Sequence, residues 1–260
     1  MADKPASPNP PDSASQIADL LVRLRRREEA KASVVRAREI AKLESDAHNQ
    51  TRKTLRRQAE QILGHLPRGI TCDTNPYLEK FHQLPHVDSE LHVYLREVLV
   101  DHYSWAIPNE AALATITRYQ PIIEIGAGTG YWAAMLRARG VDVLAVDSTP
   151  VESGLNHSYT QAAHSFTDII NTDETVVMNY PDRTLFICWP PDFSPMACSA
   201  LCHYTGKHFI LIGESDNSGQ AELHSRLEQQ WQLVDSADIP QWGGMHDWLQ
   251  VYERKTSSTI

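Results

Sequence analysis

The chain has 260 residues, of which 42% are hydrophobic and 22% charged, and its formal net charge is −9 at pH 7. This length allows one α/β domain of ordinary size with a smaller extension. Residues 1–63 carry 13 Lys and Arg against 9 Asp and Glu, a balance of +4, whereas residues 64–260 carry 11 against 24, a balance of −13. Because so acidic a domain is a poor host for a polyanion, we expect no nucleic acid partner.

Membrane segments and metal clusters are not expected from this sequence. No apolar run approaches the roughly 20 residues that span a bilayer, and no signal peptide opens the chain, so we expect a cytoplasmic protein without a membrane contact. The four cysteines fit no zinc spacing, and we expect reduced thiols and no metal site.

The N-terminal part divides into a tail and a charged helical extension. Residues 1–14 are rich in Pro, Ser and Asp and are expected to be disordered. Residues 15–63 have no Pro, and their apolar residues recur at helical spacing, as at Ile17, Leu20, Leu21 and Leu24. The apolar stripe is thin, so these helices need a partner surface. They are expected to form either a lid on the main domain or the interface of a homodimer.

A connector is expected over residues 64–93, because Pro67, Pro76 and Pro85 interrupt it. The main domain follows at residues 94–260. Its helical spacing runs through Leu99, and an aromatic loop then precedes Asn109, which is expected to cap a helix running to residue 118.

The most informative stretch is residues 121–150. An apolar strand from Ile122 to Ile125 runs into the glycine-rich loop Gly126-Ala127-Gly128-Thr129-Gly130. A helix over residues 132–139 follows, then Gly140 as its C-cap, and a strand over residues 141–146 that ends at Asp147. Glycines let backbone N–H groups and the helix N-terminus approach a ligand closely, and a carboxylate at the tip of the next strand is placed to bind a ribose diol.

The glycine spacing selects among nucleotide ligands. A dinucleotide fingerprint needs G-x-G-x-x-G, and here residue 131 is Tyr. The run E-I-G-A-G-T-G with the downstream Asp147 instead resembles motif I and the post-I acid of the class I S-adenosylmethionine-dependent methyltransferases. The resemblance covers about Tyr94 to Arg254 and implies S-adenosylmethionine as the cofactor. The positions expected to bind it are Glu124, Gly126, Ala127, Gly128, Gly130, Asp147, Ser148 and Asn171.

The rest of the chain repeats the strand-then-helix order. Strands are expected at residues 165–170, 184–189 and 208–212, and helices from residue 173, at 195–203 and at 221–230. A strand pair at residues 231–239 and 247–252 closes the chain. This order predicts an α/β fold with a doubly wound, Rossmann-like sheet, and the resemblance implies that it is mostly parallel with an antiparallel last strand.

Candidate catalytic residues lie where strands end. Cys188-Trp189-Pro190-Pro191 stands where amino-methyltransferases carry Asp, Asn or Ser before Pro-Pro and an aromatic residue; here Trp replaces the polar acceptor, which disfavours nucleobase or glutamine N-methylation. Trp105 and Trp189 offer aromatic faces to a sulfonium cation, although plain packing explains either tryptophan as well. Tyr103 and Glu214 complete the candidate set, and no general base is identified.

Three functions remain open on the sequence alone. The first is methyl transfer to a small-molecule acceptor. The second is a reaction of S-adenosylmethionine itself, in which its aminobutyrate arm cyclises to azetidine-2-carboxylate and methylthioadenosine is released. The third is a methyltransferase-like scaffold whose N-terminal helices bind a protein or RNA.

Overall fold

The computed structural model describes residues 42, 45–159, 162, 164–214, 219 and 221–256. The chain forms two compact units, Met1–Leu55 and Arg56–Ile260. In the first unit the described residues are helical, and the Thr51 and Thr54 hydroxyls donate to the carbonyls of Ala47 and Gln50. The predicted tail 1–14 and most of the predicted extension lie outside the described residues.

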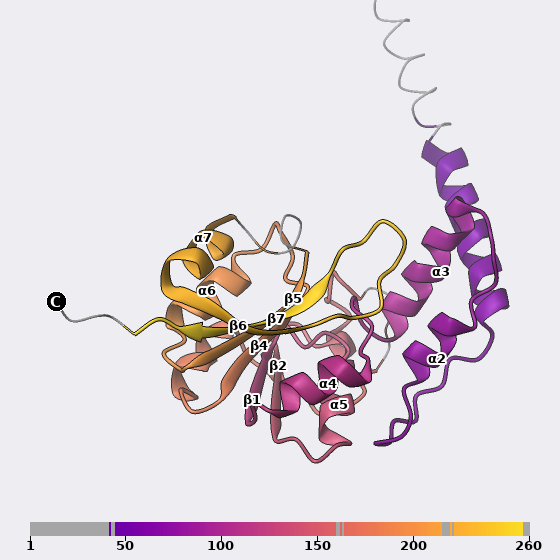
Figure 1. Ribbon diagram of the computed structural model, residues 1–260. Coiled ribbons are helices and arrows are strands. Elements are labelled where there is room, and N and C mark those ends of the chain that lie inside the picture. The colour runs from indigo at the N-terminus through magenta and orange to yellow at the C-terminus, as the bar shows by residue number, and fades with distance from the viewer. Residues whose placement is uncertain are drawn as a thin grey trace, which may run out of the picture. The chain divides into compact units, whose positions relative to one another are not determined.

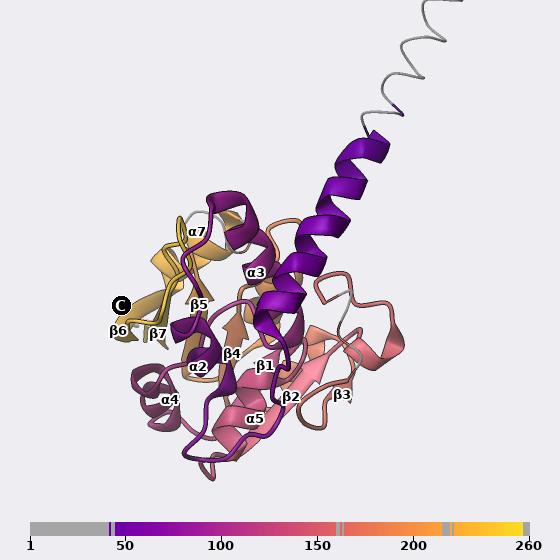
Figure 2. The same cartoon turned by 90° about the vertical axis from the view of Figure 1, so that its right-hand side faces the viewer.

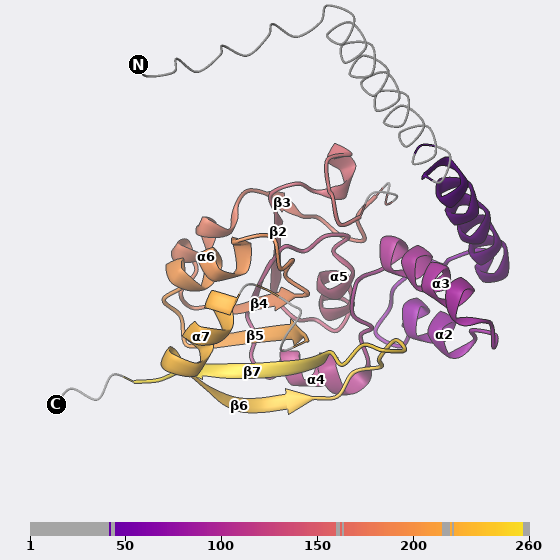
Figure 3. The ribbon, with the colours of Figure 1, turned by 90° about the horizontal axis from the view of Figure 1, so that it is seen from above.

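A seven-stranded sheet organises the described residues of the second unit, with the order β3-β2-β1-β4-β5-β7-β6 (Figure 3). Its strands are β1 (Ile122–Ile125), β2 (Val143–Asp147), β3 (Ile170–Asn171), β4 (Thr184–Cys188), β5 (His208–Gly213), β6 (Trp231–Ala237) and β7 (Trp248–Arg254). The first five strands are parallel, and β7 runs antiparallel to both β5 and β6. The predicted fold class is therefore confirmed.

Both faces of the sheet are covered because its central strands are apolar on both sides. In β1, Ile122 packs on one face, whereas Ile123 and Ile125 pack on the other. The first face is covered by α4 (Glu110–Thr117) and α5 (Tyr131–Arg137), and the second by α6 (Met196–His203) and α7 (Ala221–Gln230), as Figure 1 shows. A strand buried on both faces is the expected element of a parallel sheet.

Two further helices, α2 (Pro76–His82) and α3 (Ser89–His102), pack on the first core cluster and stand in front of the strands in Figure 2. The helix α2 lies within the segment predicted as a connector. Pro76 occupies the first turn, where proline is favourable, and the Asn75 side chain accepts a hydrogen bond from the Leu78 N–H. The prolines that indicate a connector therefore include one that starts a helix.

The third strand is shorter than predicted. Only Ile170–Asn171 pair with β2, whereas the prediction begins the strand at Ser165. The backbone before it has other partners: Arg68 Nη2 donates to the carbonyls of His164 and Ser165, and the Phe166 N–H donates to the Thr129 carbonyl. These bonds hold residues 164–166 near the glycine loop and away from the strand ladder.

The strand order reverses direction between β1 and β4. At such a switch point the loops leaving two neighbouring strands run to opposite faces, so a crevice opens at the carboxyl ends of the strands. The functional site is expected there. None of the helices among the described residues has the length and apolar character needed to cross a membrane.

Candidate functional site

The loop between β1 and α5 requires glycine for steric reasons. Gly128 has φ of +57°, which side chains rarely adopt, and a Cβ added there would lie 2.2 Å from Cε2 of Tyr159. Gly130, also at positive φ, is the N-cap of α5, which ends at Arg137 with Ala138 as its C-cap, two residues earlier than predicted. Gly140, predicted as the C-cap, follows this end with φ of +78°. There the Val141 N–H donates to the Leu136 carbonyl, as in a Schellman motif.

Asp147 joins this loop to the end of β2. Its Oδ2 accepts from the Gly128 N–H at 2.8 Å, and its Oδ1 accepts from the Thr149 N–H at 2.9 Å. The side chain is 8% exposed and lines a cavity. Each carboxylate oxygen can accept more than one hydrogen bond and here accepts one, so Asp147 retains acceptor capacity toward that cavity.

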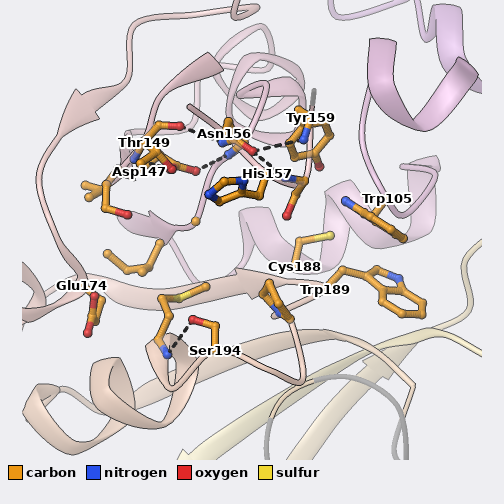
Figure 4. A pocket seen from close by; sticks show the side chains of 18 of the residues that line it. Trp105, Asp147, Thr149, Asn156, His157, Tyr159, Glu174, Cys188, Trp189 and Ser194 are labelled. Carbon is orange, nitrogen blue, oxygen red and sulfur yellow. Dashed lines mark hydrogen bonds between the residues drawn. The ribbon is translucent and has the colours of Figure 1, made fainter. Parts of the chain in front are cut away.

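The cavity has a volume of about 290 Å³ and lies at the carboxyl ends of β1, β2 and β4 (Figure 4). Six of the predicted site residues line it, namely Trp105, Gly126, Gly128, Asp147, Ser148 and Trp189. The structure therefore brings the glycine loop, the acid of β2 and the two tryptophans around one space.

Four predicted cofactor-binding residues do not line the cavity. Ala127 and Gly130 belong to the glycine loop, but both residues are buried and neither lines the cavity. Asn171 is exposed on β3 beside Asp147, and the following Thr172 lines the cavity instead. At these three positions the local backbone direction turns the residue away from the cavity, and the sequence motif does not specify that direction.

Glu124, the fourth of these residues, is 2% exposed beneath the loop. Burial raises the pKa of its carboxyl to about 8, while the nearby Arg137 and a hydrogen bond from the Ala133 backbone act in the opposite direction. Glu124 therefore contacts the first turn of α5, which positions the glycine loop.

Two predicted catalytic residues also lie away from the cavity lining. Tyr103 is fully buried, stacks on Tyr77 with ring centroids 5.0 Å apart, and donates its hydroxyl proton to the Pro67 carbonyl. Glu214 is 8% exposed, and its Oε1 accepts from the His246 N–H. The neighbouring segments hold both side chains, so neither reaches the space that Asp147 lines.

The two tryptophans form an aromatic wall of the cavity. Their ring centroids are 5.9 Å apart with an interplanar angle of 30°. Trp189 has φ of +50°, the one positive value among the described non-glycine residues, and such a residue stores roughly 1–3 kcal/mol of strain. Its indole N–H donates to Oδ2 of Asp247 at 2.9 Å, which fixes the orientation of the ring.

Sequence reasoning missed the loop that follows β2. Oδ1 of Asn156 accepts from the Ser158 and Tyr159 N–H groups, and its Nδ2 donates to the Thr149 carbonyl. This turn places the Tyr159 ring against Gly128. Figure 4 shows Tyr159 beside Asn156. Asn-x-Ser is a turn signal in the sequence, but nothing local indicates where the turn projects.

Five residues with acid–base groups line the cavity, namely Asp147, His157, Tyr159, Glu174 and Cys188. Burial raises the pKa of the Cys188 thiol well above its ordinary range, so this lining residue is a neutral thiol. Over the part of the chain that the structure describes, no cluster of His, Cys, Asp and Glu could hold a metal ion. The cavity thus has a polar side, formed by the glycine loop and Asp147, and an aromatic side, formed by Trp105 and Trp189.

No family model matches the chain, and no curated protein sequence matches it. Several solved structures are similar in fold. MtNAS in complex with MTA and tNA is 11% identical, with 78% of this chain and 71% of that one covered at a TM-score of 0.40. A Burkholderia thailandensis 1,6-didemethyltoxoflavin-N1-methyltransferase, with S-adenosylhomocysteine bound, is 17% identical over 66% and 93% of the chains at 0.38.

The glycopeptide N-methyltransferase MtfA, complexed with S-adenosyl-L-methionine, is 10% identical over 55% of this chain and 91% of that one, with a TM-score of 0.32. Identities and scores this low assign neither a substrate nor an activity to this chain.

Proposed function

We propose that the cavity binds S-adenosylmethionine and that the protein transfers its methyl group to a small-molecule acceptor. The observation that supports this most is the meeting of Asp147 with the glycine loop. Asp147 accepts the Gly128 N–H, and both residues line one cavity at the switch point of the sheet. A carboxylate beside a glycine loop at that point is suited to a ribose diol.

Different residues of the cavity would contact different parts of the ligand. The ribose hydroxyls would donate to Asp147, and the ligand would contact the backbone of Gly126 and Gly128 once the Tyr159 ring that covers Gly128 moves aside. Trp105 and Trp189 face the part of the cavity away from β2. A cation over a tryptophan face gains about 0.5–2 kcal/mol, so the sulfonium end fits this wall.

The bound cofactor supplies an electrophilic methyl group on a positively charged sulfur. The acceptor's lone pair forms the new bond to that methyl carbon, the carbon–sulfur bond breaks, and the electron pair stays on sulfur as a neutral thioether. The protein contributes alignment and exclusion of water, which account for much of the acceleration in such a displacement. The acceptor's proton, where it has one, leaves to solvent.

The first test is ligand affinity in Asp147→Asn, measured by calorimetry with S-adenosylmethionine and S-adenosylhomocysteine. Loss of a charge-assisted hydrogen bond is worth about 1.5–3 kcal/mol, so affinity is expected to fall roughly 10- to 100-fold. The matched control is Asp182→Asn, which removes an exposed carboxylate at the start of β4, away from the cavity. Unchanged affinity in Asp147→Asn would contradict the ribose assignment.

Incubation with S-adenosylmethionine alone separates methyl transfer from a reaction of the cofactor itself. Nucleosides are followed by liquid chromatography with mass detection. Methyl transfer leaves the ligand unchanged until an acceptor is added. Methylthioadenosine above a control without protein would show instead that S-adenosylmethionine is the substrate. Absence of binding in wild-type protein would favour the scaffold hypothesis.

A further inference from the structure

Asp247 reaches the wall of the cavity because β7 runs antiparallel to β5. The two strands pair with Trp248 opposite Gly213, so the start of β7 lies beside the carboxyl end of β5. The cavity opens at this same edge of the sheet. From its place directly before β7, Asp247 accepts the indole proton of Trp189, with 2.9 Å between Nε1 and Oδ2.

Trp189 is held both at its backbone and at its ring. Its backbone has φ of +50°, and its backbone N–H donates to the Ile212 carbonyl at 2.7 Å. The ring is held by Asp247, whose own backbone carbonyl accepts from Nε2 of Gln241 at 2.9 Å. Because Trp189 lines the cavity, its ring is presented to a ligand in one fixed orientation.

The carboxyl of Asp247 has few polar partners besides this indole. It belongs to a residue that is 4% exposed, and among the described residues its Oδ1 is shielded from solvent without a hydrogen-bond partner. Burial raises the pKa of the carboxyl, and the hydrogen bond from Trp189 lowers it, because a donor stabilises the charged form. The ionised carboxylate thus makes a charge-assisted hydrogen bond where little water screens it.

Such a bond makes the indole ring richer in electrons. A carboxylate at the N–H polarises the indole toward its ring, and the face of a tryptophan attracts cations through its negative quadrupole. Trp105 already has the Arg96 guanidinium carbon 5.3 Å from its ring centroid. Over Trp189 no guanidinium or ammonium group of the described residues lies. Trp189 is therefore the ring of the wall whose face is available to a charged ligand.

We infer that Asp247, acting through Trp189, is a positioning residue that makes the cavity prefer a positively charged ligand sulfur to a neutral one. The inference rests on the proposed function, in which the sulfonium lies at the aromatic wall. Methyl transfer removes the positive charge from sulfur, so the preference applies to S-adenosylmethionine and not to S-adenosylhomocysteine. The wall thereby holds the product more weakly than the cofactor, which favours their exchange after each reaction.

The test is the ratio of the affinities for these two ligands, measured by calorimetry in wild type and in Asp247→Asn. Asparagine keeps an oxygen that accepts the indole proton but carries no charge. The ratio of S-adenosylmethionine affinity to S-adenosylhomocysteine affinity is expected to fall about two- to threefold, as part of a cation–π gain of roughly 2- to 30-fold. The matched control is Asp238→Asn, which changes an exposed carboxyl between β6 and β7 and should leave the ratio unchanged.

Trp189→Phe separates an effect through the indole from direct attraction between the carboxylate and the ligand. Phenylalanine keeps an aromatic face but has no N–H for Asp247 to accept. By itself this change is expected to lower the ratio at least as far as Asp247→Asn does. In the Trp189→Phe background, adding Asp247→Asn should then leave the ratio unchanged, because the two residues act as one unit.

Three results would overturn the inference. The first is a wild-type ratio in Asp247→Asn. The second is an equal fall caused by Asp247→Asn with Trp189 or with Phe at that position, which would mean that the carboxylate acts on the ligand directly. The third is equal weakening of both ligands with a lower Tm, which would make Asp247 a structural residue. Failure of the proposed function looks different, since wild-type protein would then bind neither ligand and both ideas would fall together.

Discussion

Tyr159 is the residue whose position most limits access to the glycine loop. Its ring covers Gly128 so closely that no ligand atom can occupy the same place until the ring moves. Since its backbone is held by Asn156, the displacement involves the side chain or the whole turn. Tyr159→Ala is expected to bind S-adenosylhomocysteine about three- to tenfold more tightly, because roughly 1 kcal/mol of displacement cost is removed.

The control for this change is Leu155→Ala, which alters an exposed side chain of the same loop outside the cavity lining. Affinity is measured by calorimetry under the same conditions for the three proteins. Weaker binding by Tyr159→Ala would mean that the ring contacts the bound ligand and does not merely compete with it.

Glu124 makes stability depend on pH in a direction opposite to that of most carboxyls. Its pKa is about 8 in the folded protein and near 4.5 when unfolded, so the folded state holds a proton that the unfolded state releases between these values. The free energy of unfolding therefore falls as pH rises from about 4.5 to 8, and the full penalty is present above that window. Below pH 4.5 both states are protonated and the penalty vanishes.

The neutral isostere Glu124→Gln is expected to remove this dependence. Relative to wild type, its unfolding free energy should increase through the window by a few kcal/mol, as a pKa of about 8 in the folded protein against 4.5 in the unfolded chain implies. Urea unfolding at several pH values measures the difference, with the exposed Glu90→Gln as control. A constant difference from pH 5 to 8 would contradict a protonated Glu124.

At the scale of elements, α2 shows how one polar side chain fixes a helix against its neighbours. Oδ1 of Asn75 accepts from the Leu78 N–H and from the Tyr131 hydroxyl, and its Nδ2 donates to the Pro108 carbonyl. One residue thereby connects α2, α5 and the aromatic loop before α4.

Asn75→Ala is expected to destabilise the protein by more than the usual loss of a helix cap. A cap contributes about 1 kcal/mol, and each further buried hydrogen bond adds roughly 0.5–1.5 kcal/mol. Asp88→Ala is the comparison, because Asp88 caps α3 through the Leu91 N–H from an exposed position. Equal unfolding free energies of the two variants in urea would show that the contacts to Tyr131 and Pro108 contribute nothing.

At the scale of the whole molecule, features that depend on nearby residues can be predicted from the sequence, whereas contacts between distant segments cannot. The strand, glycine loop, helix and Asp147 of residues 121–150 are predictable because their geometry depends on nearby residues. The helix over 221–230 is found with the bounds that its periodicity predicts. By contrast, the indole hydrogen bond of Trp189 joins it to Asp247, 58 positions away, and no local pattern indicates this contact.

The same distinction explains why the predicted catalytic set was only half placed around the cavity. Trp105 and Trp189 line the cavity, whereas Tyr103 donates to the Pro67 carbonyl and Glu214 accepts from the His246 N–H. A residue's place at a strand end follows from the sequence. The direction of its side chain depends on packing among elements that are distant in the chain, such as α2 and the segment before β7.

The boundary between the two units yields a prediction for the whole molecule. Every residue that lines the cavity lies within Arg56–Ile260, so a protein of residues 56–260 is expected to fold and to bind S-adenosylhomocysteine as the full chain does. Removing residues 1–63 is a different change, because Ala59 and Leu63 are buried in the core and Leu63 accepts from Lys80 Nζ. Full burial of one leucine contributes about 1.5–3 kcal/mol.

The shorter protein, residues 64–260, should therefore unfold at a lower temperature, by roughly 2–4 °C for each kcal/mol lost. Thermal unfolding and calorimetric affinity on the three proteins measure both quantities. Methyl transfer lost in residues 56–260, with fold and affinity retained, would mean that Met1–Leu55 takes part in the reaction, as a lid would. Activity retained there would leave this unit the role of an arm for a protein partner or a second subunit.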